Sequence, residues 1–403
     1  MKKVNNEGRN TALLTADKTD LSFLDEAIDH ALQKVRLNLG QFTHAFPDDT
    51  TVDGVYKRRK PFLQDQEEGG NFGWTTSFWT GILWLSYELT EDDEYRKAAE
   101  VHVESFKKRI IEKVDCEHHD LGFLYTLSCV SAYKLTGNEE AKDAALRAAD
   151  YLMTRYFEKA GIIQAWGDLN DPAQRGRIII DCLMNLPLLY WATEVTGHSK
   201  YRDAAIAHAN NALKCIVRED ASTFHTYYFD PETGTPKYGK THQGFGDDSC
   251  WARGQAWGVY GFPLSYAYTK DPAFMEMAEK LANYFLNRTP KDGVAYWDLL
   301  FNDGSGEEKD SSASAIAACG LLEMAKWQSE DEGRRYCYHA AVVILKALYE
   351  QYSTKDSSDS NALLLHGVYA KPENLGVDEA NLWGDYYYLE GLVRLKTEWQ
   401  PYW

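Results

Sequence analysis

An acidic residue, Asp181, lies inside an apolar stretch, with Ile178–Ile180 before it and Cys182–Met184 after it. An ionised carboxylate in such surroundings is costly unless it is paired or accepts hydrogen bonds. Burial therefore favours the protonated form and raises the pKa. A carboxyl group that keeps its proton near neutral pH can serve as a general acid. A helix cap or a satisfied buried aspartate would leave the same local pattern, because structural pairs also perturb pKa values.

A second carboxylate, Asp120, follows His118 and His119 at the start of another apolar segment. Two carboxyl groups in unlike environments can supply one proton donor and one ionised partner. The alternative for the His-His-Asp run is a metal site. Adjacent histidines do not point the same way from one helix, and the chain has no HExxH motif, so we expect no metal. The sequence also lacks a G-x-S-x-G elbow, a P-loop and a dinucleotide fingerprint.

Tryptophans stand close to these polar segments, and capping does not explain them. The candidates are Trp74, Trp79, Trp166 and Trp257. An aromatic ring at the rim of a site offers a flat face to a sugar, which carries C–H groups on one side and hydroxyls on the other. Packing in the core explains each of these tryptophans equally well.

The loop between Phe224 and Trp257 carries most of the cationic and hydrogen-bonding groups nearby. They are His225, Gly239, Lys240, Thr241, His242, Gln243 and Arg253. Arg253 lies one helical turn before Trp257, so both can face one ligand. An arginine beside a tryptophan could hold the carboxylate of an acidic sugar. An ion pair of Arg253 with Asp247 or Asp248 is the alternative.

The elements that must position these residues are helices. An apolar helix, a short turn and an Ala-rich amphipathic return helix recur along the chain, as in 141–146 and 204–209. The first helix, near 23–35, has no preceding partner, and the last, 382–395, has no following one. If these two pair, about six hairpins close into an all-α (α/α)6 barrel. The polar segments then converge on one mouth, where sites usually lie. Strand signals are sparse, with 224–229 a possible strand.

Composition bounds the remaining possibilities. The chain has 403 residues, 44% of them hydrophobic, and a formal charge of −18. We predict one catalytic domain, 21–403, after a frayed segment, 1–20. The acidic balance argues against nucleic-acid binding. We expect no signal peptide and no membrane segment, and seven scattered cysteines fit a reducing cytoplasm.

Several separated motifs resemble the unsaturated glucuronyl hydrolases of glycoside hydrolase family 88, over nearly the whole chain from about residue 20. They are 118–123 (HHDLGF), 177–185 (RIIIDCLMN), 225–227 (HTY), 241–244 (THQG) and 251–257 (WARGQAW). The family has a six-hairpin (α/α) barrel, in agreement with the repeat pattern.

The resemblance implies a substrate left by a polysaccharide lyase, with a 4,5-unsaturated uronic acid at its non-reducing end. It implies that Asp181 protonates C4 and helps water add at C5, and that Asp120 is a second essential carboxylate. The matching substrate-binding positions are His119, Trp74, Trp166, His225, Gly239, Thr241, Gln243, Arg253 and Trp257. It implies no metal or organic cofactor, and the expected partner is an unsaturated di- or oligosaccharide. We expect a monomer or a weak homo-oligomer.

One departure from the family bears on the substrate. Members that prefer sulfated chains are similar in having an Arg beside the loop Gln and a Ser-rich stretch with a Lys near the C-terminus. Here His242 stands beside Gln243, and 366–371 reads HGVYAK. We therefore predict a preference for unsulfated or lightly sulfated substrates. The alternatives are an unsaturated rhamnogalacturonyl hydrolase acting on pectin fragments, a hydrolase of ordinary saturated glycosides, and a non-catalytic carbohydrate-binding helical-repeat protein.

Overall fold

The computed structural model describes residues 3–10, 20–64 and 66–403. Much of the segment predicted to be frayed lies outside these ranges. Within them, 3–10 contacts the ring: the backbone N–H of Asn5 donates to the carbonyl of Glu219 at 2.7 Å, and Glu7 pairs with Arg288 at 2.9 Å. This part of the segment therefore has defined contacts.

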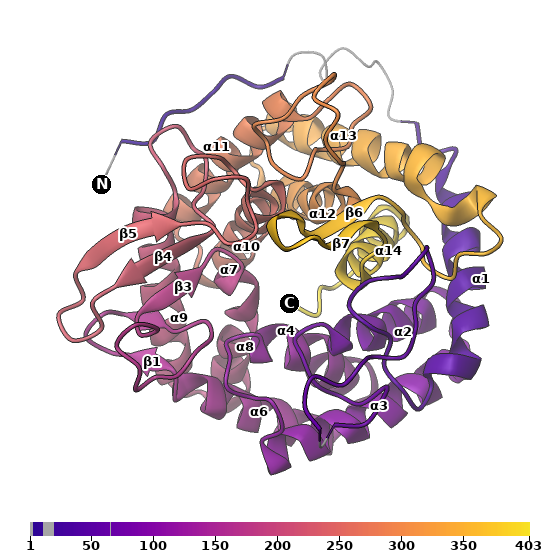
Figure 1. Cartoon of the computed structure of the whole chain (residues 1–403), viewed down its shortest axis with the longest axis horizontal. Helices are drawn as coiled ribbons and strands as arrows, with labels where there is room; N and C mark the ends of the chain where they lie inside the picture. The colour runs from indigo at the N-terminus through magenta and orange to yellow at the C-terminus, as the bar shows by residue number, and fades with distance from the viewer. Residues whose placement is uncertain (1–2, 11–19, 65) are drawn as a thin grey trace.

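The described residues form two concentric rings of helices (Figure 1). The inner ring consists of α2 (Thr76–Thr90), α4 (Leu121–Tyr125) with η2 (Thr126–Val130) and α5 (Ser131–Thr136), α7 (Cys182–Asn185) with α8 (Pro187–Thr196), α10 (Ala252–Thr269), α12 (Ser311–Trp327) and α14 (Leu382–Lys396). The outer ring consists of α1 (Leu24–Phe42), α3 (Asp93–Glu112), α6 (Glu139–Met153), α9 (Ser199–Asn211), α11 (Pro272–Arg288) and α13 (Asp331–Ala347). The predicted (α/α)6 barrel is confirmed.

The ring closes as the repeat pattern predicted. The last inner helix, α14, packs against both α2 and the first helix, α1. The inner and outer helices differ in how much of their surface is buried. Helix α12 is buried along nearly its whole length, whereas α6 buries only one face, formed by five alanines and Leu152 at helical spacing. Small alanine side chains let the outer helices approach the inner ring closely.

Short strands are inserted between the helices. β3 (Arg177–Ile179), β4 (Thr226–Phe229) and β5 (Pro236–Lys240) form an antiparallel sheet in the order β3-β4-β5. The strand expected at 224–229 is β4. Two smaller hairpins pair β1 (Tyr156–Phe157) with β2 (Ile162–Ile163), and β6 (Gly367–Ala370) with β7 (Leu375–Glu379). The remaining short helices are η3 (Ala212–Ile216), η4 (Leu348–Tyr352), η5 (Thr354–Asp356) and η6 (Lys371–Glu373).

Among the described residues, no helix has the length and apolar character needed to cross a bilayer. The cytoplasmic location and the oligomeric state expected from the sequence stay predictions.

Candidate active site

A cavity of about 660 Å³ opens where the inner helices begin. Its walls come from segments that are far apart in the sequence and meet only because the ring closes. The lining residues are Asp49, Arg59, Phe62, Gly73, Trp74, Asp115, Glu117, His118, His119, Asp120, Trp166, Arg177, Ile179, Asp181, His225, His242, Gln243, Trp251, Arg253, Trp257, Tyr369 and Glu373.

The two predicted carboxylates lie at the starts of neighbouring inner helices. Asp120 directly precedes α4, and Asp181 directly precedes α7. Gly122 allows this approach, because a Cβ there would lie 2.2 Å from the Cα of Asn185. The Asn185 side chain joins the two helices by accepting the backbone N–H of Phe123 at 2.9 Å.

His119 stands between the two carboxylates. Its Nε2 lies 3.4 Å from Oδ1 of Asp120 and 3.3 Å from Oδ1 of Asp181. The imidazole is 2% exposed. His118 flanks the pair on the other side. Its Nε2 donates to the carbonyl of Asp115 at 3.0 Å, and its Nδ1 lies 3.1 Å from Oδ2 of Asp120. Asp120 thus has an imidazole beside each oxygen.

The surroundings shift the pKa values of the two carboxyl groups in opposite directions. Burial raises the pKa of Asp181 and the charge of Asp120 raises it further, while His119 opposes both. Burial also acts to raise the pKa of Asp120, but the nearby His119 and His118 outweigh it and the pKa falls below its ordinary value. Burial acts to lower the pKa of His119, yet the charges of Asp120 and Asp181 raise it overall. These directions agree with the predicted proton donor and ionised partner.

The same three side chains form a compact group of potential ligand atoms. One nitrogen or oxygen from each of His119, Asp120 and Asp181 lies within 4.8 Å of the others. Residue types alone would also suit a divalent cation. Removal of metal ions with a chelator distinguishes metal-assisted chemistry from proton transfer at these three side chains.

Arg253 is one of three buried arginines in the described cavity lining, with Arg59 and Arg177, and is 1% exposed. Its guanidinium pairs with Asp310 at 3.0 Å and donates to the carbonyls of Val368 and, at 2.6 Å, Tyr369. It also donates to Oε1 of Gln243 at 3.3 Å. The alternative of a partner in Asp247 or Asp248 is wrong. Asp310 pairs with Arg253 and also caps α12, accepting the N–H of Ser312 at 3.1 Å.

Two tryptophan rings hold the Arg253 side chain in one orientation. The guanidinium carbon lies 4.5 Å from the ring centroid of Trp251 and 5.0 Å from that of Trp383. Such contacts fix a planar cation more firmly than a single ion pair does. The Arg253 guanidinium, whose two terminal nitrogens already donate to protein acceptors, is therefore fixed at the cavity wall.

His225 is a neutral donor on the same wall. Its Nδ1 accepts the backbone N–H groups of His242 and Gln243 at 3.0 and 3.2 Å. Burial lowers the pKa of His225 well below its ordinary value. The proton of the neutral ring therefore resides on Nε2, which can donate to a ligand.

Gly239 and Thr241 lie outside the cavity lining. A Cβ at Gly239 would be 2.3 Å from the ring of Phe224, so glycine is needed for the close packing of β5. The Thr241 hydroxyl accepts the N–H of Gly244 at 2.8 Å. Both residues shape the loop that carries Gln243, and they do not face the pocket themselves.

The tryptophans divide between the pocket and the core. Trp74 lines the cavity and donates from Nε1 to the hydroxyl of Tyr369 at 2.9 Å. Trp166 lines it with one face covered by the guanidinium of Arg177 at 4.1 Å. Trp257 forms part of the buried floor. Trp79 belongs to the core, where its Nε1 donates to the carbonyl of Phe42 at 3.1 Å.

Sequence reasoning did not single out several lining residues. They are Arg59, Arg177, Trp251, Tyr369 and Glu373. The sequence does carry a signal for Arg177, because Arg177 and Ile179 alternate on one strand and so share a face, two residues before Asp181. Tyr369 and Glu373 had none, since their place in the site depends on ring closure.

An (α/α)6 barrel whose pocket joins two carboxyl groups with oppositely shifted pKa values and aromatic walls defines a glycosidase-like class of protein. A family model described as Glycosyl Hydrolase Family 88 matches residues 49–392. The chain belongs to glycoside hydrolase family 88, and the predicted glycosidase of the unsaturated glucuronyl hydrolase type is confirmed.

Named relatives agree over most of the chain. An unsaturated chondroitin disaccharide hydrolase of Streptococcus pneumoniae (strain ATCC BAA-255 / R6) is 49% identical over 379 residues, covering 94% of this chain and 93% of the relative. The crystal structure of an unsaturated glucuronyl hydrolase from Streptococcus agalactiae superposes with a TM-score of 0.94 at 44% identity, covering all of both chains. A mutant of that hydrolase complexed with dGlcA-GalNAc6S has a TM-score of 0.86 at 42% identity, covering 100% of this chain and 99% of the other.

Proposed function

We propose that this enzyme releases the 4,5-unsaturated uronic acid from the non-reducing end of lyase-generated glycosaminoglycan oligosaccharides by hydrating its enol-ether double bond. The observation that carries the proposal is the burial of the Asp181 carboxyl group beside His119 and Asp120, which favours its protonated form. Its pKa is raised by burial, and an imidazole shared with an ionised carboxylate stands 3.3 Å away. The relatives named for unsaturated uronosyl substrates point to the same chemistry.

In the proposed mechanism, Asp181 transfers its proton to C4 of the double bond. Positive charge then develops at C5 and on the ring oxygen. Asp181, now ionised, removes a proton from the water that adds at C5. The resulting hemiketal opens and releases the shortened saccharide. Atoms balance with one water consumed, and Asp181 ends the cycle protonated.

Asp120 and His119 set the state of this acid. Asp120 stays ionised beside two imidazoles, and its negative charge makes ionisation of Asp181 harder. We assign Asp120 to holding His119 and orienting the sugar next to Asp181.

The uronate carboxylate is proposed to bind at the wall formed by Arg253, Gln243 and His225. Arg253 is proposed to contribute its positive charge and the Nε2–H of neutral His225 a donor, and the Gln243 side chain lines the same cavity. Trp74, Trp166 and Trp257 are proposed to contact the sugar rings. His119 contributes through the carboxylates, and Gly239 and Thr241 act indirectly by shaping the loop.

The preference for unsulfated or lightly sulfated substrates remains part of the proposal. Burial lowers the pKa of His242, so this residue brings no positive charge to the wall at neutral pH. Glu373 adds a carboxylate to the lining. Lys371 is paired with Glu308 and does not line the cavity. These features disfavour a sulfate ester, although the Streptococcus agalactiae relative was crystallised as a mutant with a 6-sulfated disaccharide.

A substrate panel tests the proposal. Unsaturated chondroitin or hyaluronan disaccharide should lose its ultraviolet absorbance, and the saturated counterparts should stay intact. A 6-sulfated unsaturated disaccharide should react more slowly than the unsulfated one, and Glu373→Gln should narrow the difference. Faster turnover of the sulfated form would overturn the sulfation preference. Reaction only with pectin-derived disaccharides would support a rhamnogalacturonyl hydrolase instead.

A further inference from the structure

The segment after α14, residues 397–403, turns back into the ring. Figure 1 shows the C-terminus near the centre of the barrel. Its aromatic residues Trp399, Tyr402 and Trp403 are all buried. Trp383, at the start of α14, packs against the lining residues Trp74 and Arg253, and the helix ends at Lys396, so this tail enters the barrel from the end opposite the pocket.

Residues near the C-terminal ends of other inner helices form hydrogen bonds with this tail. The ammonium group of Lys134, in α5, donates to the carbonyls of Pro401 and Tyr402, both at 3.0 Å. The hydroxyl of Tyr268, in α10, donates to the carbonyl of Trp403 at 3.0 Å. Glu88 of α2 accepts from the tail's Trp399 and Tyr402 side chains. Lys134, Tyr268 and Glu88 each lie in the last turns of their helices.

Trp403 ends this tail near the centre of the barrel (Figure 1). It is 3% exposed, and its Nε1 donates to Glu390 at 2.8 Å. Its ring stacks on Tyr387, with a centroid distance of 6.0 Å and an interplanar angle of 10°. It meets the ring of Phe123 edge-on, also at 6.0 Å. The indole therefore has both an aromatic and a polar anchor.

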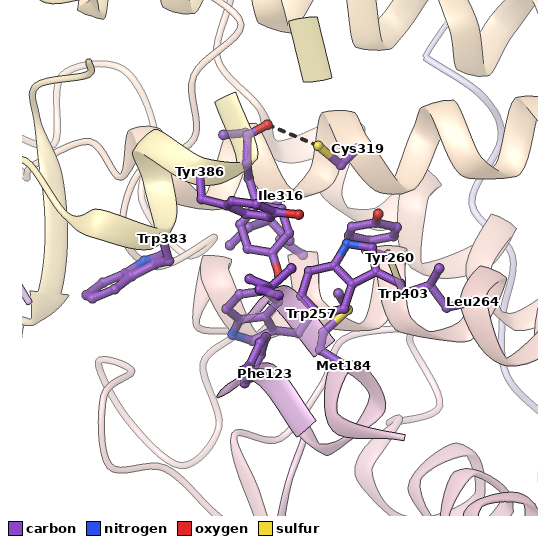
Figure 2. Packing of buried hydrophobic residues seen from close by; sticks show 14 of the residues in the cluster. Phe123, Met184, Trp257, Tyr260, Leu264, Ile316, Cys319, Trp383, Tyr386 and Trp403 are labelled. Atoms are coloured by element: carbon purple, nitrogen blue, oxygen red, sulfur yellow. Dashed lines mark hydrogen bonds between the residues drawn. The ribbon is translucent and has the colours of Figure 1, made fainter. Parts of the chain in front are cut away.

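The aromatic rings that contact Trp403 also pack against Trp257, which forms the floor of the active site. Trp257, which lines the pocket, lies 5.4 Å from Phe123 and 5.4 Å from Tyr387 between ring centroids. Figure 2 shows Phe123, Trp257 and Trp403 in one packed cluster, together with Met184 of α7. Phe123 stands three residues after Asp120, and Met184 three residues after Asp181. The tail thus lies under both helices that present the carboxylates.

We propose that the tail is a positioning element of the active site: Trp403 fills the lower opening of the barrel and holds Trp257 and the Asp120 and Asp181 helices in register. The inference rests on the proposed function of the pocket. A cavity left at Trp403 would allow the floor rings to move or water to enter. A shift of about 1 Å between catalytic group and substrate can cost on the order of 10²-fold in rate.

The test compares Trp403→Ala and Trp403→Phe with a control that removes a buried ring elsewhere. Phe274, in outer helix α11, is fully buried and stacks on Phe262 at 6.0 Å, away from the floor. We expect Trp403→Ala to lower kcat on unsaturated chondroitin disaccharide by about tenfold or more, with KM changed less than about threefold. Trp403→Phe should recover most of kcat. Phe274→Ala should lower Tm and leave kcat near wild type.

The inference is overturned if Trp403→Ala lowers Tm but has the same kcat as the control variant Phe274→Ala. If Trp403→Ala does not fold, Lys134→Met takes its place, because it removes two hydrogen bonds to the tail and leaves the core intact. Unchanged kcat in folded Lys134→Met would then overturn the inference, and a fall in kcat at constant KM would support it. Turnover of the disaccharide by the wild-type enzyme distinguishes failure of the tail's positioning role from failure of the proposed function. If the wild type does not turn over the disaccharide, the proposed function itself fails.

Discussion

The neighbours of two aspartates in one pocket shift their pKa values in opposite directions. Asp181 is buried beside a negative charge, which raises its pKa, while Asp120 has an imidazole at each oxygen, which lowers its pKa. A proton donor loses activity as pH rises through its pKa, and an ionised partner loses it as pH falls through its own. We expect a bell-shaped dependence of kcat on pH, with Asp181 setting the alkaline limit.

The variant Asp120→Asn tests that assignment. Removing the negative charge takes away one cause of the raised pKa of Asp181. The residual activity, expected to be lower by about 10²-fold or more, should therefore show its alkaline limit at lower pH than wild type. Steady-state rates from pH 4 to 9 measure this. An alkaline limit that stays in place or moves upward would contradict the coupling between the two carboxylates.

Chelation separates proton transfer from metal-assisted chemistry at the same three side chains. His119 already contacts both carboxylates, and the proposed steps use only the proton of Asp181. Prolonged dialysis against EDTA should leave kcat and KM unchanged, and added Zn²⁺ or Mg²⁺ should not raise them. Loss of activity that returns with one cation would favour a metal centre.

At the scale of elements, the close contact of α4 with α7 brings the two aspartates together. A Cβ at Gly122 would lie 2.2 and 2.4 Å from backbone atoms of Asn185. Movement of a side chain cannot relieve this clash, because the clashing atoms belong to the backbone. Gly122→Ala should therefore separate the two helix starts, lower Tm by several degrees and lower kcat by at least about tenfold.

The matched control is Gly40→Ala on outer helix α1, where nothing lies within 4 Å of the added Cβ. This change should leave kcat unaltered and leave Tm equal or slightly higher, because alanine favours the helix by about 1 kcal/mol over glycine. Equal kcat in both variants, measured on the same unsaturated disaccharide, would show that the α4–α7 contact does not position the site.

At the scale of the whole molecule, a buried carboxyl group ties α14 to the loop before β6. Asp385 accepts the N–H groups of Leu363 and Leu364 at 3.0 and 2.9 Å. Burial raises the pKa of Asp385 to about 7 from an ordinary 3.8. Between these values the folded protein binds a proton that the unfolded chain does not, so this group's contribution to stability falls as pH rises from about 4 to about 7. Asp385→Asn should flatten the fall in Tm over that range, and an unchanged slope would contradict this.

The ring itself was readable from the sequence, because apolar and Ala-rich helices alternate and the unpaired first and last helices complement each other. Asp120 and Asp181 were found because each precedes an apolar inner helix. The partner of Arg253 was not found: Asp310 lies 57 residues further on, whereas the nearer Asp247 binds the N–H of Thr241. Tyr369 and Glu373 join the pocket through the β6–β7 hairpin. Local patterns cannot reveal contacts that only ring closure creates.

The most direct test of the account compares wild type with Asp181→Asn on an unsaturated chondroitin disaccharide. The absorbance of the conjugated double bond reports hydration, and calorimetry on the variant reports binding. We predict rapid loss of absorbance with wild type, no loss with Asp181→Asn, and retained binding of the disaccharide by the variant. Loss of absorbance at a comparable rate with Asp181→Asn would contradict the assignment of Asp181 as the proton donor.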